Sequence, residues 1–205
     1  MRIRWSTHNH KAAALTSLPG SLGSAGRLIR LALVGALGAA AVVGGATAVV
    51  AVNRPITANE CLTNLAAPLI AERGLDGVQI GVDERLTGGT MAQVEMTSPT
   101  VVRIAVGTST WCGGRYEPDL RAVISHELGH VEQYRLGADP VHSALLRQRL
   151  QGAYGNQADA LEGAANCAAE IQLGVNISAY VSGPPTCTPD MLTAAQSIRD
   201  GRWPA

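Results

Sequence analysis

Apolar residues recur at every second position in three short stretches of the chain: 78–82 (VQIGV), 91–96 (MAQVEM) and 101–107 (VVRIAVG). This period is typical of β-strands with one buried face. A glycine-rich turn, TGGT, separates the first two stretches and predicts that they pair as a β-hairpin. The third stretch predicts one further strand.

Four longer stretches follow the helical period of 3.6 residues and end at or before a glycine. Asp119 and Thr188 are suitable N-cap residues for two of them. Combined with the strands, the order helix, hairpin, strand and three helices predicts an α+β fold with a small, mostly antiparallel sheet. The predicted helices span residues 58–73, 119–137, about 156–173 and 188–201.

The helix predicted at 119–137 contains the sequence HELGH, in which Glu127 lies between His126 and His130. About 0.005 matches to the pattern HExxH are expected by chance in a chain of this composition. The spacing of four residues places both imidazoles on one face of a helix, where they can bind a single metal ion. Glu127 can then act as a base towards a water on the metal. Ser125 and Glu132 are predicted to lie on the side of this helix that faces away from the core.

A tetrahedral zinc site with an open position needs a third protein ligand besides the two histidines. The pattern HExxHxxGxxH is excluded, because Gln133 and Leu136 occupy its glycine and histidine positions. The preferred candidate is Glu162, 32 residues after His130 in the stretch ALEGAANCAAE. Asp159 and Glu170 remain alternative ligands, and His142 is expected in a loop or at a helix start.

These two motifs resemble those of the gluzincin metallopeptidases, in which HExxH is followed on a later helix by Glu-x-x-Ala-[Asp/Asn]. Glu162, Ala165 and Asn166 occupy the positions of this second motif. The chain is similar to small gluzincins of the ImmA/IrrE type and to bacterial neutral zinc metallopeptidase-like exported proteins. The small side chains around Glu162 would let its helix approach the HELGH helix closely.

The resemblance implies a zincin-like fold and a catalytic Zn²⁺ ion. By this resemblance His126, His130 and Glu162 bind the zinc, and Glu127 is the general base of peptide-bond hydrolysis. Asn166 occupies a position where many such enzymes have aspartate. It is expected to accept a hydrogen bond from a ligand histidine, and an amide does so less strongly than a carboxylate.

The N-terminal part of the chain has the pattern of a membrane anchor. Residues 1–30 contain five basic and no acidic side chains, and residues 31–52 are 22 residues without a charge. A helix of this length reaches about 33 Å, enough to cross the hydrocarbon core of a bilayer. The basic residues predict that the N-terminus is cytoplasmic and that residues 53–205 are extracytoplasmic. A cleaved signal peptide, with Ala46 and Ala48 at the cleavage site, is the alternative, and it would release the same domain as a secreted protein.

The exported part, residues 53–205, has a length suited to one domain. It contains 11 basic and 16 acidic side chains, a net charge of −5, which argues against nucleic acid as a partner. All four cysteines lie in this part, and in an oxidising compartment they are expected to form two disulfides. Three pairings are open; our hypothesis is Cys61–Cys112 and Cys167–Cys187.

The resulting hypothesis is a membrane-anchored, extracytoplasmic zinc metalloprotease that acts on a peptide or protein substrate. Two alternatives remain open: an inactive, zinc-stabilised binding module, and a hydrolase of cell-wall amides. Tyr154 and Tyr180 are candidate donors to an oxyanion, although each is more typical of a core or rim residue. If the strand at 101–107 is an edge of the sheet beside the cleft, an extended peptide can add to it.

Overall fold

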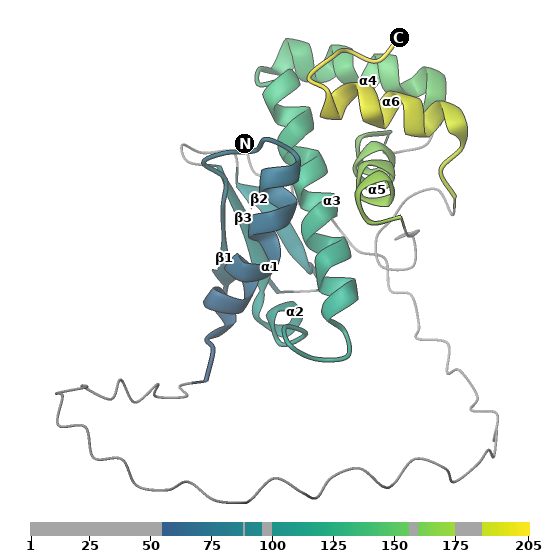
Figure 1. Cartoon of the computed structure of the whole chain (residues 1–205). Helices are drawn as coiled ribbons and strands as arrows, with labels where there is room; N and C mark the ends of the chain where they lie inside the picture. The colour runs from purple at the N-terminus through teal and green to yellow at the C-terminus, as the bar shows by residue number, and fades with distance from the viewer. Residues whose placement is uncertain (1–54, 88, 96–99, 156–159, 175–185) are drawn as a thin grey trace, which may run out of the picture. The chain divides into compact units, whose positions relative to one another are not determined.

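A computed structural model describes a domain in which a three-stranded sheet and the helices α1 (Ala58–Glu72) and α2 (Val106–Ser109) lie on one side of the long helix α3 (Glu117–Leu136) (Figure 1). The helices α4 (Pro140–Tyr154), α5 (Ala160–Leu173) and α6 (Pro189–Arg199) lie on the other side. The predicted membrane segment 31–52 lies outside the described residues. No helix within the described part is long and apolar enough to span a bilayer. The structure describes residues 55–87, 89–95, 100–155, 160–174 and 186–205.

The predicted α+β class with a small sheet is confirmed. The elements in chain order are α1 (Ala58–Glu72), β1 (Gln79–Asp83), β2 (Ala92–Glu95), β3 (Val101–Ala105), α2 (Val106–Ser109), α3 (Glu117–Leu136), α4 (Pro140–Tyr154), α5 (Ala160–Leu173) and α6 (Pro189–Arg199).

The predicted hairpin and the mostly antiparallel sheet are wrong. The strand order is β1-β3-β2, in which β3 pairs parallel with β1 and antiparallel with β2. Alternation fixes which face of a strand is buried but does not choose its neighbour. The third strand is buried along almost its whole length, whereas β1 and β2 are mostly half-buried. Burial on both sides favours the central position for β3, and the chain leaves this strand at Ala105, two residues before the predicted end.

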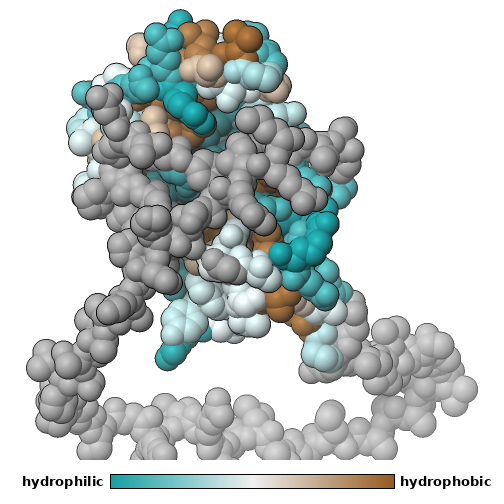
Figure 2. All heavy atoms as spheres, turned by 180° about the vertical axis from the view of Figure 1, so that it is seen from behind, coloured by the Kyte–Doolittle hydropathy of each residue, from teal (hydrophilic) through white to brown (hydrophobic). Residues whose placement is uncertain are grey.

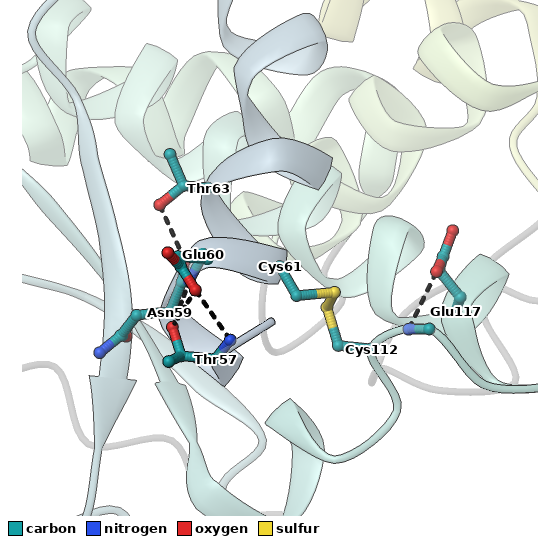
Figure 3. Close-up of a disulfide and its surroundings, with 8 residues drawn as sticks. Thr57, Asn59, Glu60, Cys61, Thr63, Cys112 and Glu117 are labelled. Carbon is teal, nitrogen blue, oxygen red and sulfur yellow. Dashed lines mark hydrogen bonds between the residues drawn. A yellow bond between two sulfur atoms is a disulfide. The ribbon is translucent and has the colours of Figure 1, made fainter. Parts of the chain in front are cut away.

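The ends of the helices follow local chemistry. Thr57 and Glu60 form a reciprocal capping box at the start of α1 (Figure 3), and the side chain of Thr188 caps α6 as predicted. The predicted start of α3 at Asp119 is two residues late, because Pro118 fits the first turn of a helix that begins at Glu117.

Sequence analysis missed helix α4. Its N-cap Asp139 is followed by Pro140, the same combination of cap and proline that identified α6. One face buries Leu146, Leu150 and Tyr154, but Val141 and Leu145 are exposed. Figure 2 shows hydrophobic surface at the upper end of the domain, where α4 lies in Figure 1. Apolar residues on both sides of the helix conceal the amphipathic pattern on which prediction depends.

The two predicted disulfides are both present: Cys61–Cys112 and Cys167–Cys187. The first joins α1 to the loop before α3, where Glu117 accepts a hydrogen bond from the backbone of Gly113 (Figure 3). The second joins α5 to the residue preceding the N-cap of α6. The first disulfide therefore ties the start of α1 to the segment before α3, and the second ties the start of α6 to α5.

Candidate metal centre

Three buried side chains from α3 and α5 converge on one point. The Nε2 atom of His126 lies 3.1 Å from Nε2 of His130 and 3.2 Å from Oε2 of Glu162, and Nε2 of His130 lies 2.9 Å from Oε1 of Glu162. At most 8% of each residue is exposed. We call this group of His126, His130 and Glu162 the metal centre.

The donor set fits a divalent metal ion. Ligand atoms of a tetrahedral zinc site lie about 3.3 Å apart when the zinc–ligand distances are about 2.0–2.1 Å. The two histidine nitrogens lie 3.1 Å apart, and each lies 2.9–3.2 Å from a different carboxylate oxygen of Glu162, distances close to that spacing. Two imidazoles and one carboxylate also bind other first-row metals such as iron, so the donor set could hold a metal ion but does not determine which one.

A close approach of two helices brings the ligands together. A Cβ atom built on Gly129 of α3 would lie 2.9 Å from the Cα atom and 3.2 Å from the Cβ atom of Ala165 on α5. Only glycine fits at such a contact with a neighbouring backbone. The small residues of α5 were predicted to allow this packing; the matching glycine lies within HELGH itself.

Each histidine has a hydrogen-bond partner on its other ring nitrogen. Asn166 was predicted to accept a hydrogen bond from one of the two histidines, and the structure places its Oδ1 atom 2.7 Å from Nδ1 of His126. Nδ1 of His130 lies 3.0 Å from Oε1 of Gln133, whose Nε2 donates to the carbonyl of Leu161 at 2.7 Å. Such partners orient the rings of metal-binding histidines. Sequence analysis used Gln133 only to exclude a pattern, although its position three residues after His130 places it on the same helix face.

Glu127, the predicted base, lies on α3 between the two histidines and is buried. Burial raises its pKa, and the charges of His126 and His130 oppose this rise only in part. Burial alone would lower the pKa of His130, but the charge of Glu162 and their hydrogen bond raise it to about 9. Burial would raise the pKa of Glu162, but the two histidines hold it well below its usual range.

Those of the other candidate residues that the structure describes do not join the metal centre. Glu170 is on α5 but is not among the gathered donors. His142 interacts with Asp139 at the exposed start of α4, as expected for a helix start. The hydroxyl of Tyr154 donates to the backbone of Met191 at 2.7 Å inside the core, so it is a core residue. Asp159 and Tyr180 lie outside the described residues.

A second buried polar group on α3 was not predicted. The guanidinium of Arg73 donates to Glu132 at 3.1 Å, to Ser125 at 2.7 Å and to Gln172 at 2.7 Å. Ser125 and Glu132, predicted to face away from the core, are therefore covered by α1 and α5. Burial lowers the pKa of Arg73 to about 10, although Glu132 opposes the shift. We call Arg73, Ser125, Glu132 and Gln172 the arginine cluster.

Comparisons of the chain with protein-family models, with curated proteins and with solved structures give no match. The metal centre therefore rests on the residues and their geometry alone.

Proposed function

We propose that this chain is a zinc metallopeptidase of the gluzincin type with a zincin-like fold. The observation that carries the proposal is the convergence of His126, His130 and Glu162 beside a buried glutamate, Glu127, on the same helix. Structural zinc sites are closed by four protein ligands, whereas catalytic sites have three and keep one position for a water. The described residues gather three ligands, and Glu127 is the carboxylate that could act on such a water. The resemblance to HExxH and Glu-x-x-Ala-Asn motifs supports the same conclusion.

The proposed roles follow from the chemistry of each group. His126, His130 and Glu162 would hold the zinc ion, and Asn166 and Gln133 orient the two imidazoles. Bound zinc supplies Lewis acidity, which lowers the pKa of water and polarises a carbonyl group. Glu127 would take the proton of the attacking water and transfer it to the leaving amine. The buried surroundings of Glu127 favour this proton transfer by excluding bulk water.

The route for peptide binding needs a correction. The stretch 101–107 cannot accept a peptide as an added strand, because β3 is the central strand. We propose β2 instead, the edge strand that packs against α3. Its register with β3 directs the backbone groups of Ala92 and Val94 towards the free edge, since Met91 bonds to Ala105 on the other side. Replacing Val94 by proline should weaken cleavage and leave zinc content intact; unchanged cleavage would contradict strand addition.

We further propose that residues 31–52 anchor the enzyme and that residues 53–205 are extracytoplasmic. The two disulfides support an oxidising compartment. Extraction of membranes with alkaline carbonate tests the anchor: the chain should stay in the membrane pellet. Recovery in the soluble fraction, shortened at its N-terminus, would instead support a cleaved signal peptide.

The main experiment compares the full chain, purified in detergent, with a Glu127→Gln variant. Both should contain stoichiometric zinc, and only the first should cleave members of a peptide library, with a loss of about 10²-fold or more in the variant. Glu170→Gln is a matched control on the partly buried end of α5 and should retain zinc and cleavage. Zinc binding without cleavage in the unaltered chain would favour the binding module, and activity confined to cell-wall amides would favour the amide hydrolase.

A further inference from the structure

Gln133 contacts both helices of the metal centre with one amide group. Its Oε1 lies 3.0 Å from Nδ1 of His130 on α3, and its Nε2 lies 2.7 Å from the carbonyl oxygen of Leu161 on α5. Only 6% of the residue is exposed. A buried amide with partners at both ends has a fixed orientation, because reversing it would place two acceptors against each other.

This orientation determines which nitrogen of His130 holds a proton. The carbonyl of Leu161 can only accept, so the amide NH₂ group must face it and the amide oxygen must face His130. Nδ1 of His130 therefore donates, and in the neutral ring the lone pair is on Nε2. That atom is the one that lies 2.9 Å from Glu162 and 3.1 Å from His126.

The same amide also limits the position of Glu162, since Leu161 is the residue immediately before it. Asn166 makes the complementary connection from α5 back to His126 on α3. The two ligand-bearing helices are thus joined by two amide side chains, one contributed by each helix.

We infer that Gln133 is a positioning residue that fixes the metal-binding tautomer of His130 and its register with Glu162. This inference rests on the proposed metal site but not on peptidase activity. It assigns Gln133 a function through His130 and the backbone of α5, without contact to the substrate.

The test uses Gln133→Met, which keeps a similar volume and removes both hydrogen bonds, in the full chain in detergent. Zinc affinity, measured by competition with a chelator of known affinity, should fall about 10–100-fold. Gln172→Met is the matched control, because Gln172 is a glutamine of the arginine cluster that bonds to Arg73 and to the backbone of Leu69. It should lower stability but change zinc affinity less than about threefold. If Gln133→Met does not fold, Gln133→Asn replaces it in the test. Its amide is one methylene too short to reach both partners, so zinc affinity should fall in this variant as well.

A second measurement follows the ring itself. In zinc-loaded, ¹⁵N-histidine-labelled protein, the Nδ1 proton of His130 should exchange slowly with water, and exchange should become faster in Gln133→Met but not in Gln172→Met. Equal effects of the two substitutions on zinc affinity and exchange would overturn the inference and leave the metal site intact. Absence of zinc binding by the unaltered chain would overturn the metal site together with the inference.

Discussion

The metal centre and the arginine cluster share helix α3, and both join it to α5 through buried polar side chains. They differ in how they balance charge. The arginine cluster contains its own cation, the guanidinium of Arg73, which donates to Glu132 and Ser125. The metal centre brings together imidazole nitrogens and carboxylate oxygens, which are atoms that bind a cation.

The cation of the arginine cluster is part of the chain, whereas the cation of the metal centre would be an ion that can bind and leave. A buried carboxylate is costly unless a positive charge and hydrogen bonds offset its desolvation. Glu132 receives that charge from a side chain that stays protonated in water at all ordinary pH values. At the metal centre, the charge of Glu162 raises the pKa of His130, so the carboxylate favours a positive charge beside it. Stability should therefore depend chiefly on the arginine cluster, and metal binding on the metal centre.

The largest expected effect comes from the arginine cluster. Arg73→Met should lower the free energy of unfolding by about 3–5 kcal/mol, because it leaves the buried carboxylate of Glu132 without its main partner. Denaturant unfolding of the variant measures this loss. The double variant Arg73→Met with Glu132→Leu should recover much of the stability, since it removes the unpaired charge. A double variant as unstable as the single one would show that packing, not charge, is what Arg73 contributes.

A smaller effect should arise at the metal centre, and only when zinc is present. At a free zinc concentration of 100 times the dissociation constant, the unaltered chain should gain about 2.7 kcal/mol in free energy of unfolding. His130→Ala should gain none, whereas Arg73→Met should gain the full amount despite its lower starting stability. Thermal unfolding with and without zinc tests this. Loss of the zinc effect in Arg73→Met would show that the two clusters are not independent.

Short-range patterns predicted the helix that carries the two histidines and the start of α6. The spacing of His126 and His130 fixes their convergence once the segment is helical, and Thr188 with Pro189 defined the start of α6. The choice of Glu162 came from resemblance, because nothing within α5 distinguishes its carboxylate from that of Glu170. The structure brings Glu162 into the group and leaves Glu170 out of it.

Features that depend on distant partners were not predictable in the same way. The position of β3 between β1 and β2 depends on burial from both sides, which alternation does not reveal. The burial of Glu132 depends on Arg73, 59 residues earlier in the chain, and a helical wheel assigns such a residue to the solvent side. Gln133 was on the correct helix face, but its second partner, the backbone of Leu161, belongs to another helix.

The smallest expected effect on stability concerns the contact that both clusters need, the close packing of α3 on α5. Gly129→Ala places a methyl group 2.9 Å from a backbone carbon of Ala165, which cannot move without shifting α5. We expect a loss of about 1–3 kcal/mol in free energy of unfolding from overpacking, together with weaker zinc binding, because Glu162 moves with α5. Gly152→Ala on α4 is the matched control, since no atom lies within 4 Å of its added Cβ, and it should stabilise by about 0.5–1 kcal/mol through helix propensity. Chelator competition and denaturant unfolding on both variants separate the two effects. Full zinc affinity in a destabilised Gly129→Ala variant would mean that the metal centre tolerates a displaced α5, and that the arginine cluster alone depends on the helix contact.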